Sequence, residues 1–279
     1  MSSLRVRVPA SSANLGPGFD ALGMALTLHL EMGIVDGSEL PEFAKVIDHS
    51  HPSLAAFRHA GGTGDLWVKS VIPMGRGLGF SGAARVAGVV LGHSQRHGKE
   101  SLVTDRRELL RLSTELEGHP DNVAASLVGG VTASSGGEVV KVPLGFDPAF
   151  IAWVPETQTS TEKSRTAIAA SIPLRDVVFN IGHTALLMAA FAAGDVSVLR
   201  EATKDLMHQD VRFAASPQSH EAYTAALTTD AWCSWLSGSG PTVGVLCAKA
   251  DAQRIAAQLP TTGITHVRSE EHTSELQSH

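Results

Sequence analysis

Alternating polar and apolar residues predict the first strands of the chain. Leu4–Val8 alternates regularly, and Ala25–Val35 places four apolar side chains between Leu26 and Met32 on one face. Because residues i, i+2 and i+4 of a strand share a face, this pattern predicts a half-buried sheet. Shorter apolar runs predict further strands at Leu66–Ile72, Gly130–Ala133, Val139–Val142, Ile151–Val154, Val243–Cys247 and Ile264–Val267.

Helical spacing of apolar residues predicts helices between these strands. One helix carries four leucines from Leu109 to Leu116, with Thr104 as its expected N-cap and Gly118 at its end. Others are expected at Pro52–Ala60, Ser81–His97, Glu162–Ala170, Leu174–Ala193, Val196–His208, His220–Thr228 and Ala250–Gln258. Strands and helices interleave without a steady βα alternation, which favours an α+β fold over a doubly wound parallel sheet.

The domain boundary is expected near residue 145, because Pro143, Gly145 and Pro148 separate two predicted strands. This gives domains at 1–145 and 146–267.

The last twelve residues, Arg268–His279, read RSEEHTSELQSH and match the conceptual translation of a common sequencing-adapter oligonucleotide. We therefore expect residues 268–279 to be a non-native tail that cuts the preceding strand short.

Composition narrows the classes of function. The chain is 43% hydrophobic and 18% charged with a net charge of −6, so it has no basic excess for binding nucleic acid. Cys233 and Cys247 show no metal-binding pattern, and Met1–Pro9 lacks an apolar signal core. The most apolar stretch, Thr184–Ala193, is about half as long as a bilayer crossing requires. A cytoplasmic protein without a membrane partner is expected.

A glycine-rich segment between a predicted strand and a predicted helix is the strongest local chemical signal. It reads PMGRGLGFS from Pro73 to Ser81. Its glycines permit left-handed backbone and close approach of a ligand, and the free N–H groups of the following helix can bind an anion. The Ser81 hydroxyl could add a contact to phosphate or a metal. A glycine-rich connection without a ligand is the alternative, and neither a Walker loop nor a dinucleotide fingerprint fits.

Two further motifs accompany this loop. PASSANLGPGFD runs from Pro9 to Asp20, and SGSGPT runs from Ser237 to Thr242. In this order and at these separations, the three motifs resemble the GHMP kinases (galacto-, homoserine, mevalonate and phosphomevalonate kinases) over essentially all of residues 4–267. NLGPGFD at Asn14–Asp20 and EGHPDN at Glu117–Asn122 are similar to the homoserine kinases in particular.

The resemblance implies an α+β fold of two parts. These are an N-terminal domain related to ribosomal protein S5 domain 2 and a C-terminal ferredoxin-like α+β domain. It also implies ATP over the glycine loop, L-homoserine between the domains, Mg²⁺ as cofactor and a homodimer. The implied reaction transfers the γ-phosphoryl group to the homoserine hydroxyl, giving O-phospho-L-homoserine for threonine biosynthesis.

The resemblance also implies roles for individual residues. The nucleotide would be bound by Pro73, Gly75, Arg76, Gly77, Leu78, Gly79, Ser81, Gly238 and Gly240, and Mg²⁺ by Ser81 and Glu117. Homoserine would contact Asn14, Asp20, His119, Arg165 and Arg212, with Asp121, Asn122 and Thr161 as catalytic residues. Oxygen ligands suit Mg²⁺, arginine binds a carboxylate through two parallel hydrogen bonds, and Asp20 could bind the ammonium group of a zwitterion.

Each residue also has an ordinary structural interpretation. Asp121 and Asn122 could cap a helix at Val123–Leu127. Asp20 could be a turn residue, His119 a loop residue, Arg165 and Arg212 surface charges, and Glu117 a solvated residue with Glu115 an equal candidate for the metal. Only their joint match to one family outweighs these alternatives.

Phe80 departs from the family pattern, which has paired small serines after Gly-Leu-Gly. The phenylalanine removes one hydroxyl and adds bulk, but backbone amides supply most of the contacts to phosphate. Two rival functions stay open: another small-alcohol GHMP kinase, of the mevalonate or diphosphocytidyl-methylerythritol type, or a non-catalytic nucleotide or amino-acid binding protein. Arg165, Arg212 and Asp20 favour a zwitterionic substrate.

Overall fold

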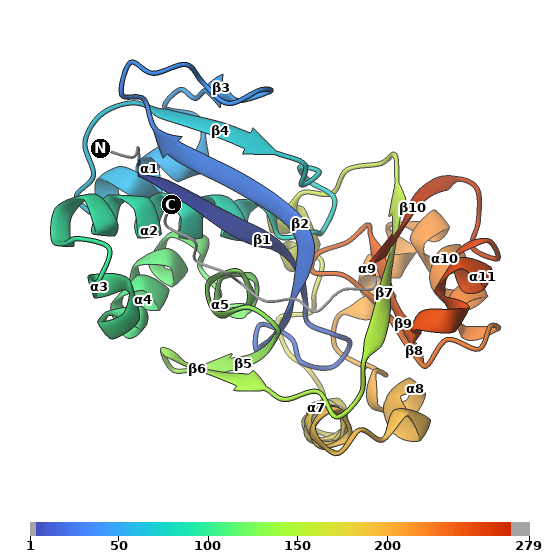
Figure 1. Ribbon diagram of the computed structural model, residues 1–279. Helices are drawn as coiled ribbons and strands as arrows, with labels where there is room; N and C mark the ends of the chain where they lie inside the picture. The colour runs from blue at the N-terminus through green and yellow to red at the C-terminus, as the bar shows by residue number, and fades with distance from the viewer. Residues whose placement is uncertain (1–3, 269–279) are drawn as a thin grey trace.

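A long strand organises the first half of the chain in the computed structural model, which describes residues 4–268 apart from the side chains of Thr161 and Arg268 (Figure 1). Strand β2 (Leu22–Ile34) pairs with β1 (Arg5–Ala13) along one edge. Its other edge is shared by β4 (Leu66–Ser70) and β5 (Val131–Ser135). The two-residue β3 (Lys45–Val46) and β6 (Glu138–Val142) complete a sheet in the order β3-β4-β2-β5-β6.

Helices cover one face of this sheet in two layers. The inner helices α2 (Phe80–His97) and α5 (Asp121–Val128) lie against β1 and β2, and α1 (Pro52–His59) and α4 (Arg106–Glu117) pack on α2 (Figure 1). Close packing of α1 on α2 requires glycine at Gly88 and Gly92, where an added Cβ would lie 2.2 Å and 2.4 Å from backbone carbonyl oxygens of α1. The small residues of α2 thereby fix its position, and its first turn points at the site described below.

The second sheet has the topology expected for the C-terminal half. Its strands β7 (Pro148–Pro155), β8 (Cys233–Leu236), β9 (Val243–Ala248) and β10 (Gly263–Arg268) lie in the order β10-β7-β9-β8 with antiparallel pairing throughout. Helices connect β7 to β8, and α11 (Ala252–Ala256) connects β9 to β10, which is the βαββαβ order of ferredoxin-like domains. The predicted fold is confirmed.

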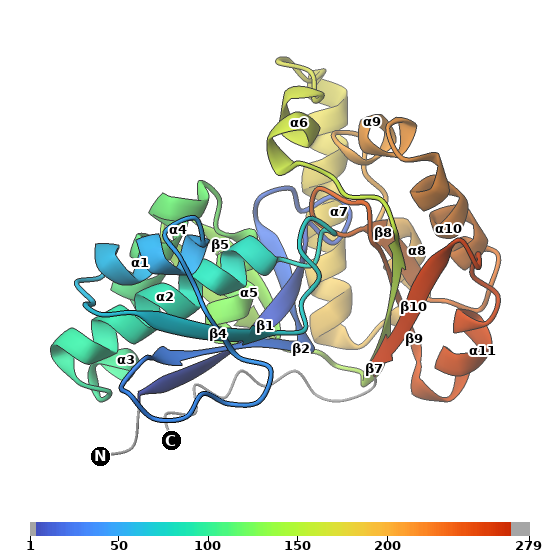
Figure 2. The ribbon, with the colours of Figure 1, turned by 90° about the horizontal axis from the view of Figure 1, so that it is seen from above.

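The two faces of β7 contribute to different cores. Phe150 and Ala152 belong to the large core shared with the first half of the chain. Ile151 and Trp153 belong to a smaller core beneath α11 and α10 (Pro217–Leu227). The two halves therefore meet through a continuous apolar core, and Figure 2 shows the two halves side by side from above. The remaining helices are α3 (Ser101–Thr104), α6 (Thr161–Thr166), α7 (Leu174–Ala193), α8 (Leu199–Ala202) and α9 (Gln209–Ala214), with 3₁₀ turns at Val196–Val198 and Lys249–Asp251.

Several predicted elements differ from the structure. The single helix expected at Val196–His208 is a 3₁₀ turn followed by α8 and a non-helical segment. The leucine-rich helix begins at Arg106 after Asp105, and Thr104 instead ends α3. Strand β8 was not predicted. Residues 269–279 of the expected tail lie outside the described residues. The division of the chain into two domains at residue 145 stays a prediction.

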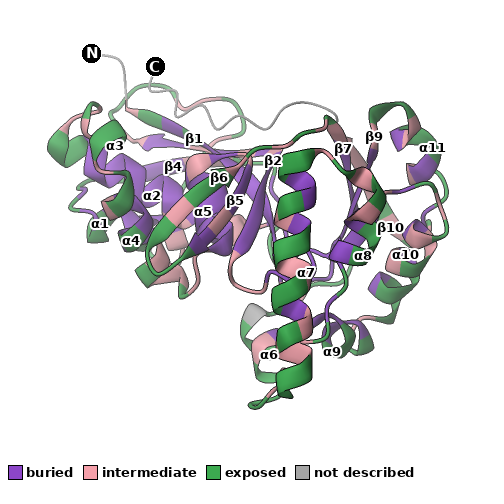
Figure 3. Ribbon diagram, turned by 90° about the horizontal axis from the view of Figure 1, so that it is seen from below, coloured by how far each residue is buried: buried purple, intermediate pink, exposed green. Residues whose placement is uncertain are grey.

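Helix α7 has an exposed apolar face that runs its length (Figure 3). Among the described residues it is the one helix long and apolar enough to suit a membrane crossing, and 22% of its most apolar stretch is buried. Helix α7 is longer than Thr184–Ala193, the most apolar stretch identified in the sequence. Single helices of this kind also occur in soluble proteins, so length and composition alone do not assign α7 to a membrane.

Candidate active site

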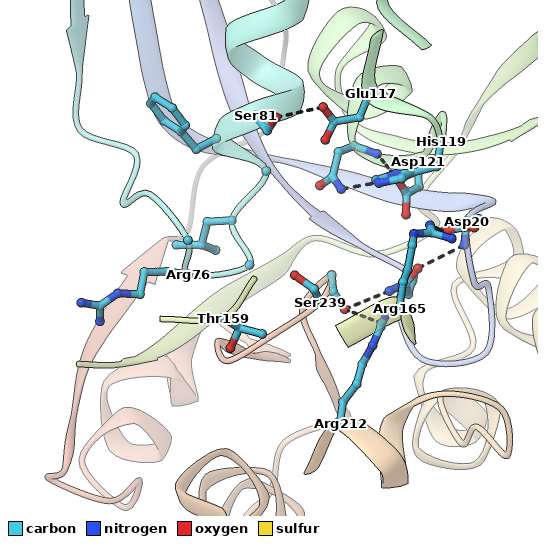
Figure 4. A pocket seen from close by; sticks show the side chains of 18 of the residues that line it. Asp20, Arg76, Ser81, Glu117, His119, Asp121, Thr159, Arg165, Arg212 and Ser239 are labelled. Carbon is cyan, nitrogen blue, oxygen red and sulfur yellow. Dashed lines mark hydrogen bonds and ion pairs between the residues drawn. The ribbon is translucent and has the colours of Figure 1, made fainter. Parts of the chain in front are cut away.

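A cavity of ≈ 240 Å³ lies where the two halves of the molecule meet. Every residue predicted for the site lines it except Gly240 and Thr161. Thr161 begins α6, and its side chain lies outside the described part of the structure. Figure 4 shows side chains from both halves converging on this space.

The glycine loop forms one wall, and its backbone can be built only with glycine at two positions. Gly77 and Gly79 have φ of +73° and +67°. A Cβ at Gly77 would lie 2.4 Å from the Ser237 carbonyl oxygen, and one at Gly79 would lie 2.0 Å from the Ser11 hydroxyl oxygen. Gly79 precedes the first turn of α2, where no side chain caps the helix, so its amide groups remain available to an anion.

A chain of hydrogen bonds ties the glycine loop to the second sheet. The Trp235 indole N–H donates to the Ser12 hydroxyl at 2.9 Å, and the hydroxyls of Ser12 and Ser237 lie 2.7 Å apart. Ser237 donates to the Gly77 carbonyl at 2.6 Å, so Ser12 is the donor between the two serines. The SGSG motif therefore acts as a support for the loop.

Gly240 and the Arg76 side chain lie away from the surface of the cavity (Figure 4). Gly240 does not line the cavity; its carbonyl lies behind the loop, within 2.8 Å of where a Gly77 Cβ would stand. The Arg76 side chain points away from the cavity and donates to the Pro155 carbonyl (Figure 4). Thr159 and Ser239 also line the cavity and were not predicted as site residues; Ser239 belongs to the SGSGPT motif, whereas Thr159 lies in a loop without a recognisable motif.

Ser81 and Glu117 bring two oxygen donors together beside the loop. The Ser81 hydroxyl donates to Glu117 Oε2 at 2.9 Å, and the Glu117 side chain is only 8% exposed. A serine hydroxyl and a carboxylate are hard oxygen ligands, so this donor set fits Mg²⁺ that keeps several waters. Glu115 lies on the exposed side of α4, where it pairs with Arg111. The geometry therefore favours Glu117 over Glu115 as the metal-binding carboxylate.

His119, Asp121 and Asn122 form a buried polar cluster at the start of α5. Asp121 Oδ1 accepts from the Asn122 backbone N–H at 2.7 Å and from His119 Nδ1 at 2.6 Å. The side-chain oxygen Oδ1 of Asn122 accepts from the Ser11 hydroxyl at 2.8 Å. Capping explains part of this cluster, since Asp121 lies in the first turn, but both side chains also line the cavity. Helix α5 begins two residues before the helix predicted for this segment.

Asn14 and Asp20 present polar groups to the cavity from a loop in unusual backbone conformations. Their φ values are +70° and +57°, a region that Asn and Asp tolerate better than most residues. The Asn14 amide bridges the Asp20 N–H and the Gly238 carbonyl at 3.1 Å and 3.0 Å. The Asp20 carboxylate forms an ion pair with Arg165. Opposite charges thus lie side by side, as the two ends of an amino acid require.

The same arrangement creates a second group of candidate metal ligands. Ligand atoms of Asp20, His119 and Asp121 lie within 4.8 Å of one another. The Asp20 carboxylate is already paired with Arg165, and His119 donates to Asp121. These partners satisfy the cluster without an ion, so we interpret it as a polar substrate surface.

Arg212 is buried behind this surface and is 6% exposed. Burial, and then the charge of Arg165, lowers its pKa to about 10. Arg212 donates to the Gly238 carbonyl at 2.9 Å, but its Nε atom is buried without a hydrogen-bond partner in the described structure. Both guanidinium groups lie over the Phe19 ring, at 5.3 Å and 5.4 Å from its centroid. Two neighbouring cations with a free donor are suited to binding an anion.

His208 positions Arg212 through a defined tautomer. Its Nε2 atom lies 2.8 Å from the Gly16 carbonyl, which can only accept, so Nε2 carries the proton. Nδ1 then accepts from Arg212 at 3.1 Å. Burial lowers the pKa of His208, which keeps the ring neutral and preserves this acceptor.

Phe80 begins helix α2, directly after the glycine loop. The ring is half-buried and packs edge-on against His51, with ring centroids 5.8 Å apart. Phe80 therefore lines the cavity while its ring contacts α1 and the margin of the core.

Comparisons with known proteins agree with this geometry. The family model for the N-terminal domain of GHMP kinases matches residues 44–130, and the model for their C-terminal domain matches residues 187–265. A homoserine kinase from Gloeobacter violaceus is 39% identical to this chain over 91% of its residues and 92% of the relative. A second homoserine kinase, from Desulfitobacterium hafniense, is 35% identical over 94% of this chain and 93% of the relative. The crystal structure of a homoserine kinase from Cytophaga hutchinsonii matches the fold with a TM-score of 0.82 at 24% identity, covering 98% of this chain and 96% of that one.

Proposed function

Because the chain belongs to the GHMP kinases, and among them to the homoserine kinases, we propose that its cavity transfers the γ-phosphoryl group of ATP to the hydroxyl of L-homoserine. The product is O-phospho-L-homoserine, an intermediate of threonine biosynthesis, and we expect the enzyme in the cytoplasm. The observation that carries the proposal is the paired charge of Arg165 and Asp20 beside the glycine loop, with Arg212 behind it.

The charge layout matches a zwitterion better than a sugar or an isoprenoid alcohol. A free amino acid has a carboxylate and an ammonium group a few ångströms apart. Arg165 and Arg212, which both line the cavity, offer donors to the carboxylate, and Asp20 offers an acceptor to the ammonium. Binding would exchange the internal Arg165–Asp20 ion pair for two ion pairs with the substrate. A sugar would leave these groups without new partners, and mevalonate, which has a carboxylate but no ammonium group, would leave Asp20 without one.

Phosphoryl transfer mainly requires positioning and neutralisation of charge. The glycine loop and the first turn of α2 supply backbone donors to the phosphates. Mg²⁺ bound by Ser81 and Glu117 would neutralise charge on the triphosphate. Asp121 and Asn122 would orient the substrate hydroxyl. Because Asp121 Oδ1 already accepts hydrogen bonds from His119 and the Asn122 amide, orientation is the role its contacts support.

The proposal is tested by substrate choice. A coupled assay of ADP release would compare L-homoserine, mevalonate, galactose and a blank without acceptor. Turnover with homoserine alone is the expected result. Equal turnover with mevalonate would favour the other small-alcohol kinases, and nucleotide binding without any turnover would favour the non-catalytic alternative.

We also propose that a second copy of this chain covers the exposed face of α7. Val178 and Ile181 are 58% and 64% exposed, and a Cβ added to Gly182 would meet nothing within 4 Å. No Asp, Glu, Lys or Arg occurs from Val177 to Gly194. An antiparallel pair of α7 helices about a two-fold axis would bring the exposed Arg175 of one copy to Asp195 of the other, so the ends of the face are complementary in charge.

Oligomeric state in solution tests this interface. Multi-angle light scattering should give a dimer, and Val178→Glu should give a monomer because it places a charge in the apolar contact. Val103→Glu is the matched control, since Val103 is 80% exposed on α3 and remote from α7. A monomeric wild type at micromolar concentration would contradict the proposal. Binding of the wild type to anionic lipid vesicles, lost in Val178→Glu, would assign the face to a membrane instead.

A further inference from the structure

Arg85 holds a position that the proposed reaction does not explain. It lies on α2 one turn after Ser81, so both side chains project from the same face of the helix. Its Nη1 atom donates to the Ser81 hydroxyl at 2.7 Å and forms an ion pair with Glu117 Oε2. The Ser81 hydroxyl donates to that same Oε2 atom. One cationic nitrogen therefore contacts both oxygen atoms expected to bind a divalent cation.

The ion pair between Arg85 and Glu117 is partly shielded from solvent. The Glu117 side chain is 8% exposed and that of Arg85 is 26% exposed, so water screens the pair poorly. Burial lowers the pKa of Arg85, which reflects the same desolvation. Arg85 does not line the cavity, so its guanidinium approaches the two oxygens from behind. A metal ion approaching from the cavity would meet a carboxylate whose charge is already neutralised.

We propose that Arg85 is a resident counter-cation that competes with the divalent metal for Glu117. In the absence of nucleotide, the guanidinium neutralises the buried carboxylate and weakens binding of free metal ions. A metal–nucleotide complex also gains the amides of the glycine loop, and these additional contacts offset the loss of the Arg85–Glu117 ion pair. Arg85 thereby makes the site selective for the metal–nucleotide complex over the free ion. This inference rests on the proposed metal-binding role of Ser81 and Glu117.

The test measures Mn²⁺ binding directly, without turnover. Free Mn²⁺ would be titrated by electron paramagnetic resonance against the wild type and Arg85→Met, with no nucleotide present. Removing a charge-assisted hydrogen bond from the competing cation should tighten Mn²⁺ binding by about ten- to a hundredfold. Arg111→Met is the matched control, because Arg111 pairs with Glu108 and Glu115 on the exposed face of α4. It should leave Mn²⁺ binding unchanged.

A second measurement separates failure of this proposal from failure of the metal assignment. With a non-hydrolysable ATP analogue present, Glu117→Gln should weaken Mn²⁺ binding. If it does not, Glu117 is not a ligand, and the metal assignment fails. If Glu117→Gln weakens binding while Arg85→Met leaves free Mn²⁺ binding unchanged or weaker, Arg85 does not compete with the metal, and this proposal alone is overturned.

Thermal unfolding supplies a readout that does not depend on nucleotide. Without metal, Arg85→Met should melt below the wild type, because Glu117 loses its cation. Added Mn²⁺ should raise the melting temperature of Arg85→Met more than that of the wild type, and an equal rise in both proteins would contradict the proposal. Should Arg85→Met fail to fold, Arg85→Gln removes the charge, keeps amide donors toward Ser81 and Glu117, and carries the same expectation.

Discussion

The two sides of the cleft are constructed differently. The proposed phosphate side is one contiguous segment, residues 73–81, whose shape depends on backbone conformation and on the absence of side chains at Gly77 and Gly79. The substrate side assembles Asn14, Asp20 and the two arginines from segments far apart in the chain, and side-chain contacts hold it together. The phosphate side should therefore be sensitive to steric change, and the substrate side to loss of charge.

The largest effect is expected at Gly79. Gly79→Ala forces a left-handed conformation on a residue with a Cβ and places that atom 2.0 Å from the Ser11 hydroxyl oxygen. Strain and overpacking together should lower the free energy of unfolding by about 3 kcal/mol and displace the loop, with ATP binding reduced on the order of a hundredfold. Denaturant unfolding and nucleotide titration measure both quantities.

Gly75→Ala is the control for that experiment. Gly75 has the same positive φ of +67°, but its nearest neighbour to an added Cβ is 3.6 Å away. Only the conformational penalty applies, so a loss of about 1–2 kcal/mol is expected. If both variants behaved alike, contact with Ser11 would not constrain the loop.

On the substrate side, Arg165→Ala should raise the KM for homoserine about ten- to a hundredfold and leave the KM for ATP nearly unchanged. The reason is that only the substrate carboxylate loses a charged donor. Arg212→Ala should have the same kinetic effect and a lower melting temperature as well, because it also removes buried hydrogen bonds to His208 and Gly238.

Steady-state kinetics with both substrates varied, alongside melting curves, distinguishes these outcomes. Arg107→Ala is a suitable control, since its side chain is 82% exposed, pairs with Glu138 and does not line the cavity. Equal increases in both KM values for Arg165→Ala would point to a folding defect and count against a carboxylate clamp.

A smaller effect is expected at the metal carboxylate. Glu117→Gln keeps the shape of the side chain but removes its charge, so kcat and the apparent affinity for Mg²⁺ should fall together, by about tenfold. Glu115→Gln should be close to wild type, because Glu115 contacts Arg111 on the exposed surface. A silent Glu117→Gln with a damaging Glu115→Gln would mean that the other carboxylate binds the metal.

The smallest effect is expected at Phe80. Phe80→Ser restores a hydroxyl beside the loop and should leave the KM for ATP within about threefold of the wild type or lower it. Losing a half-buried ring that packs against His51 should cost about 1–2 kcal/mol of stability, less than a fully buried phenylalanine. A stability loss of 3 kcal/mol or more would show that the ring is a core residue.

The non-helical segment after α8 shows where sequence reasoning failed. Val196–His208 has helical composition, yet Asp205 accepts hydrogen bonds from the His208 and Gln209 N–H groups at 2.8 Å and 2.7 Å and starts a new helix. Asn180 of α7 donates to Asp205 Oδ1 at 2.6 Å and accepts from the Leu206 N–H at 2.9 Å. This buried network involves residues 25 positions apart, so no local pattern could predict it.

The sequence by itself determined the features that depend on neighbouring residues. Strand alternation, the composition of α2 and the left-handed backbone at Gly77 and Gly79 follow from local geometry, and they predict a glycine-rich loop at the start of that helix. Tertiary structure alone decided which charges meet. The Arg165–Asp20 pair, the outward direction of Arg76 and the contact of Arg85 with Glu117 join distant parts of the chain. Such contacts depend on how the two sheets pack, and that packing reflects the whole core.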